Sequence, residues 1–366
     1  MSELRVVRAE GDPHSRGQQV GRELRDLVNE SVDFYHRYLS RRGVSSRQLH
    51  DLLTPSLAAA ETHFPVFTAI LKGMAVGAMV PVLELMAINA FEELEPLLEA
   101  PDGGVLFLRR KEGYVAPSRP CVERFTSFVV TAPGTTILAH NEHWLAGDAG
   151  NVAVILDVPD ERPVRVASPT IVCCLPAVGV NSHGVAQGIA SLAASDERLG
   201  VPRVLVSRNS LEAMDRGDAV ARAGMPARAG GYGHTFAFQG GDAFVVETTA
   251  ERLAVLDARA HTNHYLDPEL GALGPEPSPG SATRLDRLHH LLEERQPQTV
   301  PDVMEILRDH GTTPRSICQH ADPAEGEEAD AVLFSMVTEL EEGRMWVSPG
   351  NPCENGYQEI DLTGIL

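Results

Sequence analysis

The spacing of hydrophobic residues divides the chain into a helical first part and a β-rich remainder. Over Ser15–Leu39 the apolar side chains recur at about every third or fourth position, which predicts an amphipathic helix. The same period continues over Ser45–Ala60 and Pro65–Glu99, where Pro81 is typical of the start of a further helix. Helical structure is therefore predicted for residues 14–110.

Shorter runs of β-branched and aromatic residues, separated by Gly and Pro, follow and predict strands. The predicted strands are Phe125–Val130, Thr136–His140, Ala153–Asp157, Val164–Ala167, Thr170–Cys174, Gly184–Ile189, His234–Gln239, Ala243–Thr248, Arg252–Asp257, Ala331–Glu339, Arg344–Ser348 and Tyr357–Leu362. Helices are predicted at 201–224, 281–294 and 300–310, and a Pro- and Gly-rich loop at 267–281. This order predicts an α+β protein or layered sandwich in a single domain, residues 1–366, rather than a strictly alternating parallel sheet.

Composition narrows the class of partner. Hydrophobic residues make up 43% of the 366 residues and charged residues 22%, which is typical of a globular chain. The formal net charge of −20 opposes binding to nucleic acid or anionic membranes and favours cationic or neutral small molecules. The sequence has neither an apolar segment of about 20 residues nor a secretory signal, so we expect a cytoplasmic protein that does not cross a membrane.

The cysteines and the known short motifs give no sign of a metal or cofactor. The five cysteines are odd in number and irregularly spaced, and Cys173 and Cys174 are adjacent, which predicts neither a disulfide framework nor a zinc site. No GxGxxG or GxxxxGK[ST] motif is present, so no nucleotide site is predicted. We therefore expect no metal and no cofactor.

Six short stretches of the sequence together resemble a known protein family, although each stretch alone would be a weak match. They are GDPHSRGQQVGREL (11–24), ILKGMAVGA (70–78), the FTS…AHN hairpin (125–141), VGVNSHGVAQG (178–188), AHTNHYL (260–266) and RSIC (315–318). In this order they resemble the acyl-coenzyme A:6-aminopenicillanic acid acyltransferase family, a peptidase C45-like group of the N-terminal nucleophile hydrolases. The resemblance implies a four-layer αββα sandwich. Residues 1–124 would correspond to the family's pro-segment chain, and residues 125–366 to its catalytic chain.

The family's nucleophile position is occupied here by Phe125. By resemblance, family members cut themselves before a cysteine, whose thiol and new amino terminus then act together. A phenyl ring cannot perform that step, and Arg124 replaces the glycine that usually precedes the cysteine. We therefore expect an uncleaved chain. Thr126 as a substitute nucleophile is disfavoured, because a shift of one residue along a strand turns the side chain to the opposite face. Cys121 is read as a loop or surface thiol.

Other positions implied by the resemblance are partly changed. His143 stands where the family has an aspartate, and Gln319 where it has an arginine after Ser-Ile-Cys. Asn263 matches the asparagine that helps to form the family's oxyanion hole. Glu93 matches a family glutamate near the site, with a solvated helix-end carboxylate as the alternative.

The remaining candidates for chemistry lie at the end of the second hairpin strand. Glu142 beside His143 suits proton transfer near neutral pH, with a solvent-exposed pair as the alternative. Asn263 joins these two as a catalytic candidate, and the predicted substrate-binding residues are Phe125, Glu93, His140 and Gln319. The HNEH stretch is not read as a metal site, because strand alternation places His140 and His143 on opposite faces.

Three functions from different classes remain open. The first is a non-hydrolytic acid–base enzyme of small-molecule metabolism that condenses or cyclises an amine-bearing substrate, for which a Pictet–Spengler-type closure is one candidate. Its substrate would be an amine with an aromatic part that stacks on Phe125. The second is an amide hydrolase or N-acyltransferase that uses another nucleophile, and the third is a catalytically inactive binding protein. Homo-oligomerisation is left open.

Overall fold

Two β-sheets form the centre of the protein. The computed structural model describes residues 4–98 and 124–366. The first sheet has the strand order β1 (Arg5–Gly11), β4 (Val152–Pro159), β5 (Val166–Ile171), β6 (Gly179–Asn181), β7 (Val185–Leu192), β8 (Gly231–Phe238), β9 (Ala243–Thr248), β10 (Leu253–Leu256). The second sheet has the order β11 (Ala260–His261), β2 (Phe125–Ala132), β3 (Thr135–Leu145), β12 (Asp330–Glu339), β13 (Arg344–Pro349), β14 (Gln358–Ile360). Neighbouring strands are antiparallel except β1 and β4.

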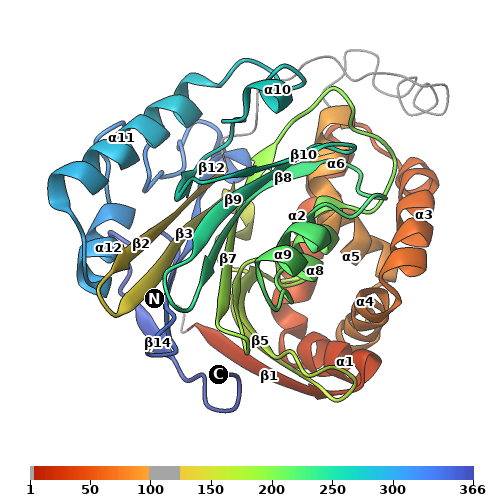
Figure 1. The fold of residues 1–366 in the computed structure, drawn as a ribbon. Coiled ribbons are helices and arrows are strands. Elements are labelled where there is room, and N and C mark those ends of the chain that lie inside the picture. The colour runs from red at the N-terminus through yellow and green to blue at the C-terminus, as the bar shows by residue number, and fades with distance from the viewer. Residues whose placement is uncertain (1–3, 99–123) are drawn as a thin grey trace.

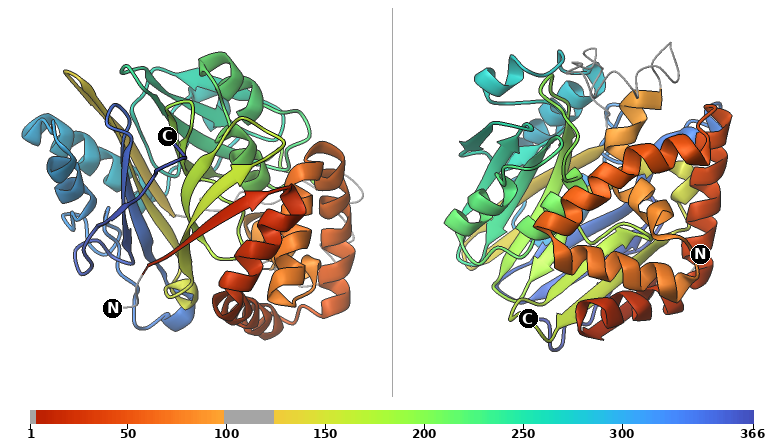
Figure 2. Two further views of the ribbon diagram at one scale, coloured as in Figure 1. Left: turned by 90° about the horizontal axis from the view of Figure 1, so that it is seen from below. Right: turned by 90° about the vertical axis from the view of Figure 1, so that its right-hand side faces the viewer.

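Helices cover the outer face of each sheet, which gives four layers (Figures 1 and 2). On the first sheet lie α1 (Pro13–Glu23), α2 (Arg25–Arg41), α3 (Ser46–His63), α4 (Pro65–Ala78), α5 (Val82–Asn89), α6 (Phe91–Leu98), α8 (Arg203–Ser210) and α9 (Arg216–Ala223). The short α10 (Pro268–Gly271) follows β11, and α11 (Pro279–Arg295) and α12 (Val300–Leu307) cover the second sheet. The predicted αββα sandwich is thus confirmed.

Strand alternation divides the second sheet into two hydrophobic surfaces. Phe128 and Ile137 point outward and pack with α11 and α12. Phe125, Val129 and Leu138 point inward and belong to the main core between the sheets. Side chains of the β2–β3 hairpin therefore point alternately to the core between the sheets and to the core beneath α11 and α12.

Helices α1 and α4 approach so closely that their backbones touch. A Cβ added to Gly17 or Gly21 would lie 2.0 Å from the Ile70 carbonyl oxygen or 2.2 Å from that of Met74. A Cβ on Gly73 would meet the His14 carbonyl oxygen at 2.1 Å. Real Cβ atoms do not approach carbonyl oxygens this closely, so only glycine fits at these positions.

Most predicted elements are found, and the differences have local causes. The helix predicted over Ser15–Leu39 is two helices that meet at Leu24, and that over 201–224 is interrupted before α9, which Asp215 caps through the amide of Asp218. The break predicted between Ala167 and Thr170 is wrong, because β5 runs through.

Further differences concern unpredicted elements. Strands β1, β6 and β11 were not predicted, and the predicted loop 267–281 contains α10 and the first turn of α11. The helical prediction for residues 99–110 and the interpretation of Cys121 fall outside the described residues.

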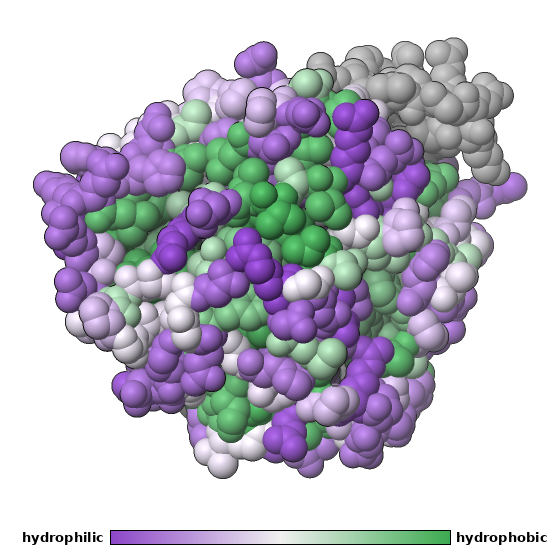
Figure 3. Space-filling view, in the orientation of Figure 1, coloured by the Kyte–Doolittle hydropathy of each residue, from purple (hydrophilic) through white to green (hydrophobic). Residues whose placement is uncertain are grey.

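Two findings concern the surface and membranes. Among the described residues, no helix combines the length and apolar character needed to cross a membrane. Figure 3 shows hydrophobic side chains gathered in the upper middle of one face, surrounded by hydrophilic ones. Leu253 and Val255 on the edge strand β10 are among the exposed large hydrophobic residues, at 40% and 42% exposure.

Candidate active site

The β2–β3 hairpin places Phe125 opposite Glu142. The hairpin turns at Gly134, whose φ of +78° suits a residue without a Cβ. Its register pairs Phe125 with Glu142 and Ser127 with His140. These four side chains share the inward face, because residues two apart on a strand point the same way. The predicted catalytic hairpin thus presents a phenyl ring, a carboxyl and an imidazole to one interior.

Phe125 fills the position at the start of β2 with aromatic bulk. Its side chain is 1% exposed and stacks on the His140 ring with centroids 6.0 Å apart and an interplanar angle of 22°. Tyr232 meets it edge to face at 6.4 Å, and Trp144 lies tilted at 6.5 Å. The backbone N–H of Phe125 donates to Asn263 Oδ1 at 3.1 Å.

A small cavity adjoins this ring. Its volume is about 30 Å³, which is space for a water molecule or a group of one or two heavy atoms. The residues that line it include Phe125, Glu142, Trp144, Cys174, Tyr232 and Phe334. Only the reacting end of a substrate fits there without movement of the walls.

A chain of hydrogen bonds leads from this cavity into the protein. Glu142 Oε2 lies 2.8 Å from His140 Nε2, and His140 Nδ1 lies 2.8 Å from Ser127 Oγ. The Ser127 hydroxyl donates its one proton to the Ile189 carbonyl at 3.2 Å, so its oxygen accepts from the Nδ1–H of His140. Nε2 is then an acceptor, and the matching donor is a protonated Glu142.

The surroundings favour the neutral form of both groups. Burial raises the pKa of Glu142 well above its usual range, the nearby Glu92 carboxylate raises it further, and Arg124 opposes this only in part. Burial lowers the pKa of His140 to about 3. Both shifts favour a neutral hydrogen bond in which the Glu142 carboxyl, which lines the cavity, donates its proton to His140.

The carboxylate of Glu93, which was predicted to bind substrate, is paired with Arg203. Its Oε1 accepts from the Arg203 guanidinium at 2.8 Å and from the Arg203 backbone N–H at 3.1 Å. Its neighbour Glu92 instead lies behind the cavity-lining Tyr232, and both Tyr232 and Ser191 donate their hydroxyl protons to it. Sequence analysis missed Glu92 because the two residues are adjacent and only the direction of the helix decides between them.

Asn263, the predicted oxyanion-hole residue, contacts the start of β2. In addition to Phe125, its Oδ1 accepts from Arg284 at 2.7 Å, and its Nδ2 donates to the Ser191 carbonyl at 3.3 Å. The amide therefore holds the start of β2 against the first sheet. Arg284 on α11, which donates to Asn263, was not predicted. Its side chain is fully buried.

Two other predicted residues lie on the opposite face of the second sheet. His143 is buried and contacts the Ile317 carbonyl through Nε2 at 3.1 Å, and Gln319 donates to the Asp330 carbonyl at 3.0 Å. Neither lines the cavity beside Phe125. The imidazole that Glu142 contacts is thus His140 and not His143, because adjacent residues of a strand point to opposite faces. The same alternation places Thr126 away from the cavity, as expected.

Arg124, where the family resemblance implies a glycine, is held by a network of its own. Its guanidinium contacts Glu95 at 2.7 Å and Asp330 at 3.0 Å, and lies 4.6 Å from the centre of the Trp144 ring. The side chain is 2% exposed. This buried pairing ties the residue before Phe125 to α6 and β12.

One thiol reaches the cavity. Cys174 is among its lining residues, and burial raises the pKa of this thiol well above its usual value, with Cys173, Asp148 and Glu142 adding to the effect. A thiol nucleophile must first lose its proton. Cys174 is therefore the available side chain for a covalent mechanism, in a setting that keeps it protonated.

A larger groove lies elsewhere, at one end of the sandwich. It has a volume of about 820 Å³, and its lining includes Glu342, Arg344, Glu359 and Asp361. Arg344 is paired with Glu359 at 2.8 Å at the surface. We place the site at the smaller cavity because buried polar groups with shifted pKa values converge there, and such groups mark functional sites.

The fold and the site together define the class of protein. The two-sheet αββα sandwich, with the start of β2 facing an asparagine between the sheets, is the arrangement expected of an N-terminal nucleophile hydrolase. The profile described as acyl-coenzyme A:6-aminopenicillanic acid acyl-transferase matches residues 130–354, and the chain belongs to this family. A search of curated proteins finds no match.

Solved structures with a similar chain path are distant in sequence. Penicillin V acylase from Agrobacterium tumefaciens is 13% identical, with 65% of this chain and 86% of that chain covered and a TM-score of 0.47. A variant of conjugated bile acid hydrolase from Clostridium perfringens is 16% identical, with 65% and 93% covered and a TM-score of 0.46. An N-acylethanolamine-hydrolyzing acid amidase orthologue from Caenorhabditis elegans is 12% identical, with 59% and 92% covered and a TM-score of 0.38.

Proposed function

We propose that this member of the acyltransferase family is an acid–base enzyme that joins an amine-bearing small molecule to a carbonyl compound, without a covalent acyl intermediate. The observation that carries the proposal is the buried Glu142 carboxyl in the wall of the cavity beside Phe125, hydrogen-bonded to His140, which in turn bonds to Ser127. A carboxylic acid that stays protonated at neutral pH is suited to donate a proton to a leaving hydroxyl group.

The chemistry balances with these residues alone. The amine nitrogen of the substrate attacks the carbonyl carbon of an aldehyde, and a proton moves from nitrogen to oxygen to give a carbinolamine. Glu142 donates its proton to the hydroxyl group, which leaves as water and produces an iminium ion. An aromatic ring carbon of the amine then bonds to the iminium carbon, and the proton lost from that ring carbon returns to Glu142. Before the transfer, His140 Nε2 accepts a hydrogen bond from this proton and so positions the carboxyl.

Two further features support this class of substrate. The cavity accepts a group the size of a small carbonyl, while the rest of the substrate extends outside it. The net charge of −20 attracts a cationic amine.

The test is turnover of tryptamine or dopamine with acetaldehyde or phenylacetaldehyde, followed by mass spectrometry for the product of condensation and loss of water. Glu142→Gln keeps the shape of the side chain and removes the acid, and we expect kcat to fall by about 10²–10⁴-fold. Glu294→Gln, the same change at an exposed glutamate of α11, is the matched control and should leave kcat unchanged.

The alternative is amide hydrolysis or acyl transfer through Cys174, which the position of that thiol in the cavity wall favours. Mass spectrometry of the purified protein distinguishes the two. A single chain of 39.5 kDa that gains no mass with activated acyl donors agrees with the proposal. An acyl adduct lost in Cys174→Ser, or full activity of Glu142→Gln, would reject it.

A further inference from the structure

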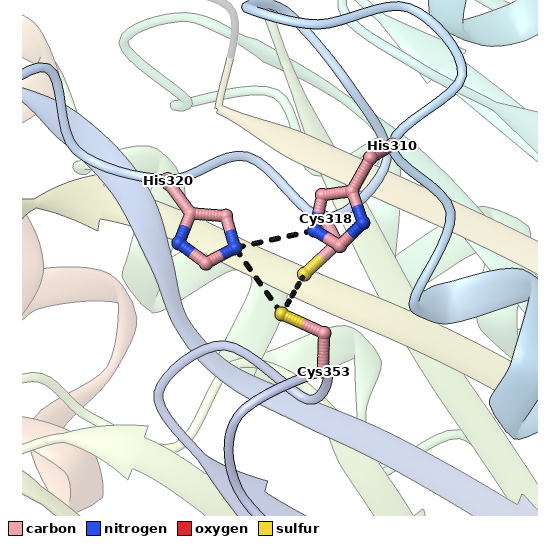
Figure 4. A group of neighbouring side chains, drawn as sticks. All are labelled: His310, Cys318, His320 and Cys353. Carbon is pink, nitrogen blue, oxygen red and sulfur yellow. Dashed lines mark hydrogen bonds between the residues drawn. The ribbon is translucent and has the colours of Figure 1, made fainter.

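Four metal-ligating side chains from two loops meet at the edge of the second sheet (Figure 4). His310, Cys318 and His320 belong to the segment between α12 and β12, and Cys353 belongs to the loop between β13 and β14. One potential ligand atom from each side chain lies within 4.8 Å of all the others. The imidazole and thiol groups point toward a common centre.

The separations are within a few tenths of an ångström of those in a tetrahedral site. His310 Nε2 lies 3.2 Å from His320 Nε2, His320 Nε2 lies 3.1 Å from Cys353 Sγ, and the two sulfur atoms are 3.6 Å apart. Zinc bonds of about 2.0–2.3 Å to nitrogen and sulfur place tetrahedral ligand atoms about 3.3–3.8 Å apart. A disulfide would require about 2.05 Å between the sulfur atoms, so the two cysteines are not bonded to each other.

Neighbouring polar groups orient the cluster in the manner of known metal sites. Asn351 Nδ2 points at Cys318 Sγ at 3.5 Å and donates to the Gln319 carbonyl at 2.8 Å. The other ring nitrogen of His320 lies 3.6 Å from the Glu354 carboxylate. A carboxylate on the outer nitrogen fixes the ring and makes the inner nitrogen a better ligand.

We propose that His310, Cys318, His320 and Cys353 bind one Zn²⁺ ion. Two imidazoles and two thiols are a ligand set that Zn²⁺ accepts in tetrahedral geometry, and four protein ligands leave no open position, so the site is structural rather than catalytic. The spacing of these residues matches no zinc motif, which is why sequence analysis predicted no metal site.

The position of the site shows what the ion would stabilise. It fastens the segment that contains Cys318 and His320 to the β13–β14 loop. The neighbouring Ile317 carbonyl accepts from Asn141 at 2.9 Å and from His143 at 3.1 Å, both on β3. The ion therefore supports the outer side of the strand whose inner side carries His140 and Glu142. This inference does not depend on the proposed reaction.

The test measures zinc in the full-length protein after dialysis and compares it with Cys353→Ser. Cys353 is exposed, so its replacement by serine leaves the fold intact, which circular dichroism can verify. We expect about one zinc per chain in the wild type and at least a tenfold loss in the variant. His290→Gln, at an exposed histidine of α11, is the control and should retain zinc.

Two further measurements separate a metal site from a hydrogen-bonded cluster. Co²⁺ in place of Zn²⁺ should give the thiolate charge-transfer and tetrahedral absorption bands, and Cys353→Ser should weaken them. Glu354→Gln should lower zinc affinity by about tenfold without changing the stoichiometry. Equal zinc in the wild type and Cys353→Ser, or a Cys318–Cys353 disulfide in place of zinc, would overturn the inference.

Discussion

The two faces of β3 present similar side chains to different surroundings. On the inner face, His140 and Glu142 share a proton beside a cavity of about 30 Å³. On the outer face, Asn141 and His143 bond to the backbone of the segment that carries the proposed zinc ligands. The inner face thus combines ionisable groups with a space, whereas the outer face uses its polar groups to attach a loop.

This difference shows that neighbours rather than residue type decide the role of a histidine. His140 is fully buried against a carboxyl, and its pKa is lowered to about 3, so it serves as a fixed hydrogen-bonding partner. His310 and His320 lie near the surface beside two thiols, where an imidazole lone pair can bind a metal. Three predictions test the difference between the inner and outer faces of the second sheet.

The largest expected effect is on the inner face. Phe125→Ala should lower the free energy of unfolding by about 3–5 kcal/mol, because it removes a ring that contacts His140, Trp144 and Tyr232 and leaves a cavity. Urea denaturation measures the loss, and Phe125→Leu should show a smaller one. An unchanged midpoint would mean that the ring does not pack as described.

On the outer face, Asn141→Ala should lower the free energy of unfolding by about 2 kcal/mol. Its Nδ2 donates to the carbonyl oxygens of Leu307 and Ile317 at 3.0 and 2.9 Å, and both bonds are buried. The same urea assay applies. Gln298→Ala, which shortens an exposed amide side chain just before α12, should change the value by less than about 0.5 kcal/mol. Equal effects of the two variants would contradict the assigned role.

The third prediction concerns pH. The pKa of Glu142 is raised in the folded protein, so its stabilising contribution is present below the unfolded pKa of about 4.3 and is lost as pH rises through the folded pKa. The advantage of the wild type over Glu142→Gln should therefore shrink as the pH rises above about 5, by at most about 1.4 kcal/mol per pH unit. An advantage that grows with pH would show that Glu142 is ionised.

Local patterns predicted the elements, and tertiary contacts decided the rest. The β2–β3 hairpin was predictable because Ala132-Pro133-Gly134 interrupts two β-rich runs. Strand β1 was not, since the pairing that stabilises it is with β4, where each partner lies 148 residues later in the chain. The break between α1 and α2 at Leu24 was not predicted either, because neither Gly nor Pro stands at that position.

The candidate site was predicted in position but not in every partner. Phe125 and Asn263 were predicted through the family resemblance, and they are in contact. The pairing of Glu142 with His143 overlooked strand alternation, which selects His140 instead. The proposed zinc ligands could not be predicted from sequence, because only the fold of the β12–β13 hairpin brings Cys353 next to the other three.

The glycines of α1 and α4 explain what two of the recognisable sequence stretches encode. GDPHSRGQQVGREL and ILKGMAVGA each carry two glycines four residues apart, and their absence of side chains lets one main chain rest on the other. These stretches therefore record a fit between two backbones rather than a reaction. A protein can keep these stretches while its chemistry changes entirely. Their presence therefore indicates common ancestry and does not identify the reaction.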